Sequence, residues 1–111
     1  MLDRITDRLE RYLDLLSLRQ KLVAGNIANA DTPGYRTRDI DFQSELRSEI
    51  AGAPRAVEVD GLKVNNDGNN VSLDRETRLL AENAIRFNIA ASLLRAELRS
   101  VKSAIQEGRN G

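Results

Sequence analysis

The sequence predicts a mainly α-helical protein in which two long antiparallel helices, one at each end of the chain, form a coiled-coil pair. Three observations support this fold class. Apolar residues recur every three or four positions over residues 2–30 and again over 72–107, which is the spacing of one helix face. Both prolines lie between these two segments. At 111 residues the chain has room for one domain, so we expect residues 1–111 to form a single elongated domain.

The first predicted helix covers residues 2–30. Its main apolar stripe is formed by Leu2, Ile5, Leu9, Tyr12, Leu16 and Val23. A second set of leucines lies off that stripe at Leu15, Leu18 and Leu22. A helix with apolar residues on two faces needs more than one packing partner. On its polar face, Asp7 and Arg11 are four residues apart, and we expect them to form a weak ion pair.

The connecting segment covers residues 31–71 and begins with a turn. Pro33 cannot continue the helix, and Gly34 after it suits the position of a type II turn that requires positive φ. Apolar residues four apart then predict a short helix over 41–50, which the Gly and Pro of 51–54 end.

Residues 57–64 alternate apolar and polar around Asp60-Gly61, which indicates a β-hairpin. The alternative is an extended loop, because an isolated two-stranded hairpin is only marginally stable. Residues 65–70 are rich in Asn, Asp and Gly and are expected to form turns.

The second long helix is predicted over residues 72–107. Ser72 can cap its start, Asp74 and Glu76 place negative charge in its first turn, and Gly108 follows its end. Its apolar positions alternate in steps of four and three, which is the coiled-coil period. They are Leu80, Ala84, Phe87, Ala91, Leu94, Leu98, Val101 and Ile105. We call these eight residues the heptad stripe.

In an antiparallel pair, the connecting segment is expected at the far end, with both termini together at the other end. Two helices cover only one side of each other, so several apolar residues should remain partly exposed and form an interaction surface. They are Leu15, Leu18, Leu22, Leu79, Ile85, Ile89 and Leu93.

The composition argues against an enzyme. The chain has no His and no Cys, so the usual ligands of zinc and haem and the usual nucleophile pairs are missing, and we expect no catalytic, cofactor or metal site. Close carboxylates such as Asp39 and Asp41, or Asp74 and Glu76, are more often solvated or capping groups than acid–base pairs. The 17 Lys and Arg balance 17 Asp and Glu, which argues against nucleic acid as a partner. No apolar stretch is long enough to insert into a membrane.

Three segments resemble a known family. They read LVAGNIANADTPGY at residues 22–35, RTRDIDF at 36–42 and DGNNVSLD at 67–74. The first resembles the N-terminal signature of the bacterial flagellar rod, hook and hook-associated axial proteins. The other two are similar to the proximal rod subgroup of that family. Ser72 stands where the family usually has Asp, and the connecting segment is shorter than in many relatives.

The resemblance implies a non-enzymatic structural subunit of the periplasmic flagellar rod, the drive shaft for motility. Its implied partners are further copies of itself, other rod subunits, the membrane–supramembrane ring with its junction adaptor, and the flagellar type III export apparatus. Export without a cleaved signal peptide is implied as well. Within the family, another rod subunit is the alternative, and distal members carry a larger middle domain. Outside it, the alternative is a soluble homodimeric coiled-coil adaptor or regulator.

Two groups of residues are expected to form the assembly interface. The first surrounds the turn and comprises Asn26, Ile27, Asn29, Asp31, Thr32, Pro33, Gly34 and Tyr35. The amides of Asn26 and Asn29 either brace the loop or a neighbouring subunit, or merely cap the helix. Tyr35 either reaches a partner with its hydroxyl or simply packs. The second group is the heptad stripe.

Overall fold

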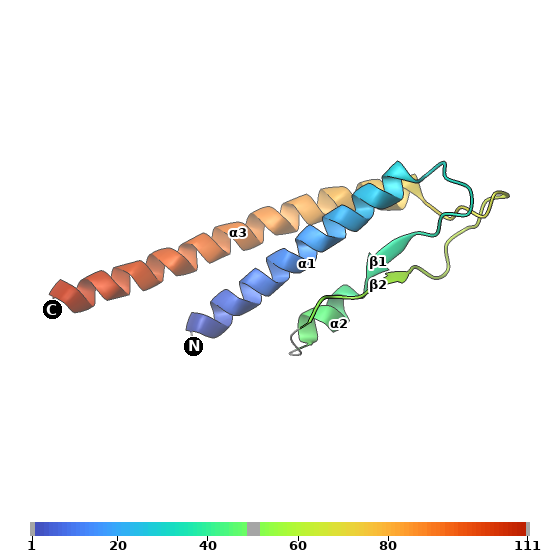
Figure 1. Cartoon of the computed structure of the whole chain (residues 1–111). Helices are drawn as coiled ribbons and strands as arrows, with labels where there is room; N and C mark the ends of the chain where they lie inside the picture. Colours follow the sequence, from blue (N-terminus) through green and yellow to red (C-terminus); the bar gives the residue numbers. More distant parts are fainter. Residues whose placement is uncertain (1, 49–51, 111) are drawn as a thin grey trace.

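The computed structural model describes residues 2–48 and 52–110, which form a long, thin molecule measuring 71 × 26 × 17 Å (Figure 1). Its elements, in chain order, are α1 (Leu2–Ala28), β1 (Arg38–Ile40), α2 (Phe42–Arg47), β2 (Ala56–Glu58) and α3 (Leu73–Asn110). The Cα radius of gyration is 18.5 Å. A compact chain of this size would have about 13 Å. The elongation follows from the two long helices.

α1 and α3 run antiparallel and lie against each other, which confirms the predicted fold class (Figure 1). They meet at the end where α1 stops and α3 starts. Because α3 has 38 residues and α1 has 27, α3 extends beyond the start of α1 at the other end. None of the described helices combines the length and the apolarity needed to cross a membrane.

The helix boundaries lie close to the predicted ones. Ser72 caps α3 as expected, because its Oγ accepts a hydrogen bond from the backbone N of Arg75 at 3.2 Å. α1 ends two residues earlier than predicted, at Ala28. α3 continues through Gly108 to Asn110, so this glycine does not end the helix.

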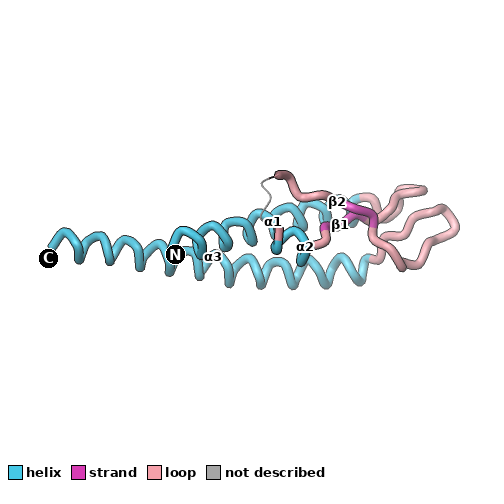
Figure 2. Tube along the Cα trace, turned by 90° about the horizontal axis from the view of Figure 1, so that it is seen from below, coloured by secondary structure: helices cyan, strands magenta, loops and turns pink. Residues whose placement is uncertain are grey.

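We had expected the connecting segment to stay at the far end of the helix pair. It instead folds back along α1 (Figure 2). Ile40 and Phe42 pack on Leu15 and Leu16, and these four side chains form one buried apolar cluster. The ring of Tyr12 meets that of Phe42 edge to face, with centroids 5.5 Å apart.

The expectation that the off-stripe leucines of α1 stay partly exposed is therefore wrong for one of the three and correct for the other two. Leu15 is fully buried, while Leu18 and Leu22 pack against the core as partly buried side chains. The second apolar face of α1 is covered by the chain's own connecting segment.

The predicted hairpin around Asp60-Gly61 is also wrong. β2 instead pairs antiparallel with β1, with Asp39 opposite Val57, and residues 62–64 lie outside any strand. Residues 39–40 are buried against the helix pair and provide a fixed edge. Pairing with that edge is more favourable than forming an isolated ribbon.

The short helix α2 is shorter than predicted. The side chain of Asp41 caps its start by accepting a hydrogen bond from Ser44 N at 3.3 Å. It ends at Arg47, because the backbone of Ser48 is extended, with φ −68° and ψ 127°. The last two positions of the prediction, Glu49 and Ile50, lie outside the described residues.

The face of α3 that contacts α1 is centred beside the heptad stripe, not on it. Its most buried side chains, seven residues apart, are Glu76, Asn83 and Ala90. Within the heptad stripe, four residues are half-buried and four are exposed. The half-buried ones are Leu80, Ala91, Leu94 and Val101, and the exposed ones are Ala84, Phe87, Leu98 and Ile105. The contact between α1 and α3 thus covers one edge of the heptad stripe and leaves its other edge exposed to solvent.

Candidate assembly interface

Asn26 holds the chain after the turn against α1. Its side chain is 1% exposed and satisfies both backbone groups of Arg38, donating to the carbonyl at 2.9 Å and accepting from the N–H at 3.1 Å. It also donates to Glu76 Oε1 at 3.0 Å and accepts from the Tyr35 hydroxyl at 3.1 Å. Asn26 therefore braces the loop, and the hydroxyl of Tyr35 bonds within the chain.

Asn29 caps the end of α1. Its Nδ2 donates to the backbone carbonyl of Gly25 at 2.8 Å, and its Oδ1 accepts from Thr32 Oγ1 at 3.0 Å. The turn that follows is the predicted one, because Tyr35 N donates to Thr32 O at 3.2 Å and Gly34 has φ +76°. The tip of this turn is exposed over residues 31–34.

Two asparagines that we had expected only in turns are buried clamps. Asn69 is fully buried, and its Nδ2 donates to the backbone carbonyls of Asn29 and Thr32 at 2.9 and 2.8 Å. Asn70 Oδ1 accepts from Thr37 N at 2.6 Å. The bonds of Asn69 tie the segment before α3 to the end of α1, and the bond of Asn70 ties it to Thr37, next to β1. The density of Asn in 65–70 was the available signal, but it predicts turns and not their partners.

An ionic cluster joins α1, β1 and α3. Arg19 binds both carboxylate oxygens of Asp39, at 3.1 and 2.9 Å, and Arg75 binds Asp39 Oδ2 at 2.8 Å. Arg75 also donates to Glu76 Oε1 at 2.8 Å. Our expectation of solvated or capping carboxylates is correct for Asp41 and wrong for Asp39 and Glu76, which are 5% and 0% exposed.

The Glu76 carboxyl is the least favourably placed member of this cluster. Burial raises its pKa above the ordinary 4.5, although Arg75 and the hydrogen bond from Asn26 act in the opposite direction. Its Oε2 has no hydrogen-bond partner among the described residues. Above the raised pKa, folding must therefore bury a charge that is only partly compensated.

We expect Glu76→Gln to change how stability depends on pH. Between pH 4.5 and the raised pKa, folded wild-type chains hold a proton that unfolded chains have released, so their stability falls as pH rises. The variant lacks this titration, so its stability relative to the wild type should increase across that window. Urea unfolding followed by circular dichroism from pH 4 to 8 measures the difference. The exposed control Glu107→Gln should parallel the wild type, and a parallel Glu76→Gln curve would contradict the prediction.

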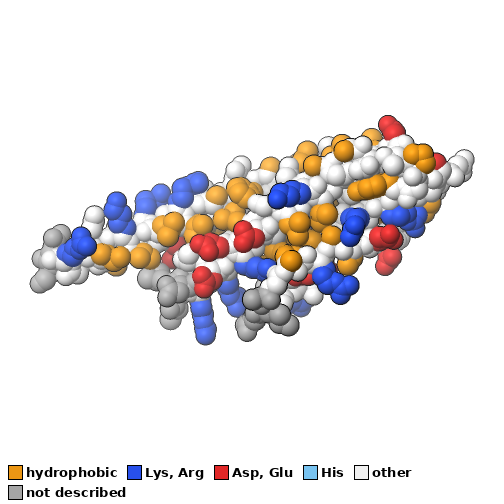
Figure 3. Space-filling view, in the orientation of Figure 1, with side chains coloured by type: hydrophobic (Ala, Val, Ile, Leu, Met, Phe, Trp, Pro, Cys, Tyr) orange, Lys and Arg blue, Asp and Glu red, His pale blue; other side chains and the backbone are white. Residues whose placement is uncertain are grey.

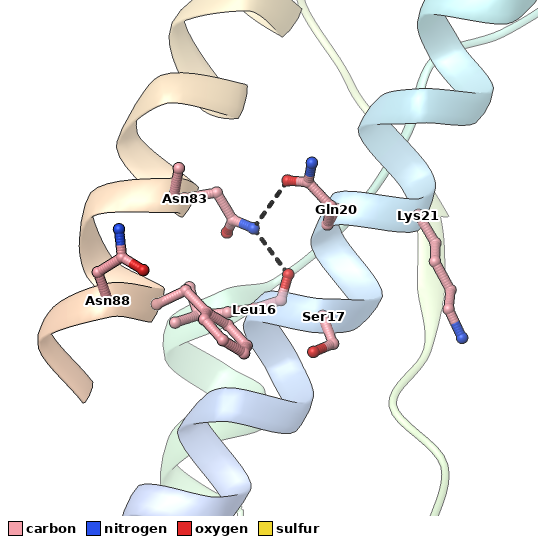
Figure 4. A pocket seen from close by; sticks show the side chains of 8 residues that line it. Leu16, Ser17, Gln20, Lys21, Asn83 and Asn88 are labelled. Carbon is pink, nitrogen blue, oxygen red and sulfur yellow. Dashed lines mark hydrogen bonds between the residues drawn. The ribbon is translucent and has the colours of Figure 1, made fainter. Parts of the chain in front are cut away.

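A groove of about 430 Å³ lies between α1 and α3 (Figure 4). At its floor, Asn83 Nδ2 donates to the backbone carbonyl of Leu16 at 2.8 Å and to Gln20 Oε1 at 3.2 Å. The exposed heptad residues Ala84 and Phe87 form part of one wall. The remaining lining residues are Ser17, Lys21 and Asn88.

A second exposed apolar row lies on α3 outside the heptad stripe. Ile85, Ile89 and Leu93 are 61%, 57% and 53% exposed and Leu79 is half-buried, so all four are at least partly exposed, as the sequence predicted. Ile27 on α1 is 36% exposed. No group of His, Cys, Asp or Glu able to hold a metal ion is found in the described ranges. The candidate interface therefore combines polar side chains that hold the turn in place with exposed apolar side chains.

Comparison with known proteins gives a consistent result. The family model described as "Flagella basal body rod protein" matches residues 13–36, which cover the second half of α1 and the turn. The chain is 35% identical to the flagellar basal body rod protein FlgB of Salmonella typhimurium and 31% identical to that of Escherichia coli, over 97% of this chain and 99% of each relative. FlgB of Borreliella burgdorferi is 28% identical over 94% of this chain and 97% of its own length.

The alignments with the two enterobacterial proteins extend over 137 positions, more than the 111 residues of this chain, so these relatives carry residues that it lacks. The similarity nevertheless covers nearly the whole of both chains. With the matched motif forming the braced end of a long helix pair, the chain belongs to the FlgB family of flagellar basal body rod proteins.

Proposed function

We propose that this chain is a structural subunit of the proximal flagellar rod in the periplasm, and that it assembles through its helices. Its proposed partners are further copies of itself, other rod subunits, and the membrane–supramembrane ring with its junction adaptor. The type III export apparatus, acting without a cleaved signal peptide, is the proposed delivery route.

The observation that best supports assembly is that α3 exposes apolar side chains on two of its faces. These side chains come from two rows, one of them the open edge of the heptad stripe, on a helix only partly covered by α1. They are Ile85, Phe87, Ile89, Leu93, Leu98 and Ile105. Apolar surface of this extent is typical of a subunit that completes its core in an assembly. The braced turn and the ionic cluster hold the helix pair that presents it.

The first experiment is mass spectrometry of hook–basal bodies purified from the source organism and washed with detergent and salt. The proposal expects this chain at a few copies per structure after washing. Its absence from these preparations, while it is present in the cytosol, would contradict the proposal and leave the soluble coiled-coil adaptor as the leading function.

We expect Leu94→Asp to allow export but block incorporation into the rod, because it places an unpaired charge in the half-buried edge of the seam. Swimming in soft agar and the amount of the chain in washed basal bodies measure the effect. Ala53→Asp introduces the same charge at an exposed position of the connecting segment, outside both apolar rows of α3, and should leave both unchanged. Normal swimming by Leu94→Asp cells would contradict the packing on which the proposal depends.

A further inference from the structure

Two rows of exposed charge face solvent on the long helices. The acidic row on α1 consists of Asp7, Glu10 and Asp14, and the basic row on α3 consists of Arg95, Arg99 and Lys102. No ion pair joins either row to any part of the chain that the structure describes. Arg11, expected to pair with Asp7, binds Glu45 Oε2 at 3.4 Å instead. In Figure 3, acidic side chains gather over the N-terminal half of α1 and basic ones along the C-terminal half of α3.

The spacing of the two rows matches in antiparallel order. From Asp14 back to Asp7 the steps are four and three residues, and from Arg95 to Lys102 they are also four and three. Opposed antiparallel helices with these steps bring each carboxylate to one cation. The pairs are Asp14 with Arg95, Glu10 with Arg99, and Asp7 with Lys102.

Within one chain these pairs are out of register. The hydrogen bonds from Asn83 to Leu16 and Gln20, and from Asn26 to Glu76, fix how α1 and α3 face each other. In an antiparallel helix pair, residues that face each other have residue numbers with a constant sum. That sum lies between 99 and 103 for the residues joined by these bonds. For each of the three charge pairs it is 109. The shift is about two helical turns, or roughly 11 Å along the axis. The rows can meet only between different copies.

We propose that the acidic row on α1 of one copy binds the basic row on α3 of a second copy, staggered by about 11 Å along the helix axis. This inference rests on the proposed function and names one contact of the assembly. Leu98 and Ile105, 53% and 55% exposed, lie within one turn of the basic row and add apolar surface to the contact.

The stagger determines what kind of assembly results. A two-fold axis parallel to the helices permits no axial shift, and one perpendicular to them would make α1 of one copy parallel to α3 of the other. An antiparallel, shifted contact is therefore heterologous, and repeating it produces an open helical array. Exposed ion pairs contribute little binding energy individually, but a row of three determines register and partner choice.

Charge exchange tests the pairing in the cell. We expect Glu10→Arg or Arg99→Glu alone to reduce the copies in washed basal bodies about tenfold, because each places like charges opposite one another. The double variant restores the pair and should return to within twofold of wild type. Asp60→Arg reverses an exposed charge of the connecting segment, outside both rows, and should have no effect. Far-ultraviolet circular dichroism of each purified variant verifies that the fold is unchanged.

Cysteine cross-linking tests the stagger, since the chain has no cysteine of its own. Chains carrying both Glu10→Cys and Arg99→Cys should form a ladder of dimers, trimers and larger species in oxidised basal bodies. A mixture of the two single variants should form dimers only. In a chain carrying Asp7→Cys and Arg95→Cys, which lie at about one level within the chain, the ladder should be much weaker.

Each result separates this inference from the proposed function. If the single reversals behave like Asp60→Arg, or the ladder stops at dimers, the staggered contact is wrong. If the double variant is no better than the singles, the rows bind other proteins and not a second copy. In all three cases wild-type chain in washed basal bodies still supports the rod function, whereas its absence contradicts both.

Discussion

Asn26→Ala is expected to lower the free energy of unfolding by about 3 kcal/mol, because it removes four hydrogen bonds of a buried amide at once. The N–H and carbonyl of Arg38 lose their partner, and Glu76 loses one of its two hydrogen-bond donors. The chain after the turn is then held less firmly against α1, so the loss should also loosen residues 35–40.

Urea unfolding followed by circular dichroism measures the first effect, and amide hydrogen exchange over residues 35–40 measures the second. Asn66→Ala is the matched control, because Asn66 is exposed and its side chain has no hydrogen bond to other described residues. It should change stability by less than about 0.5 kcal/mol. Equal effects of the two substitutions would show that Asn26 does not brace the loop.

Asp39→Asn should destabilise the chain by about 2–4 kcal/mol, because it leaves the guanidinium groups of Arg19 and Arg75 without their shared carboxylate. The value lies below that for a fully buried cluster, since these two side chains remain 21% and 18% exposed. Removing the charge also weakens the tie between β1 and both long helices.

Asp41→Asn, two residues away, is the control for this substitution. Asp41 is exposed and caps α2, and asparagine is an equally good cap, so the stability should stay within about 0.5 kcal/mol of wild type. Thermal unfolding at low and moderate salt measures both variants. A loss for Asp39→Asn no greater than that for Asp41→Asn would mean that the cluster does not stabilise the fold.

The two long helices, the start of the second and the turn after the first could be predicted from the sequence because the signals are local. A helix buries one face at a fixed spacing, so the apolar rhythm of residues 2–30 and 72–107 indicates it without knowledge of a partner. Ser72 as a cap and Pro33-Gly34 as a turn are equally local, since each acts on its own backbone.

Which residues lie at the centre of the contact between α1 and α3 could not be predicted from the sequence. Apolar periodicity identifies the heptad stripe, but the chain buries Glu76 and Asn83 at the seam. There they bond to Asn26, Leu16 and Gln20 of α1, and Glu76 also to its neighbour Arg75. A polar residue in a helix is expected to face solvent as long as its hydrogen-bond partner in the fold is not known.

The sequence alone therefore determined the helix pair, its connecting turn and, through its similarity to known rod proteins, the family. Only the tertiary structure decided that the connecting segment covers the second face of α1, that β2 pairs with β1, and that Asn69 and Asp39 are buried. These features depend on contacts between residues far apart in the chain. Local backbone preference does not encode such contacts, because their energy arises only when the packed partners meet.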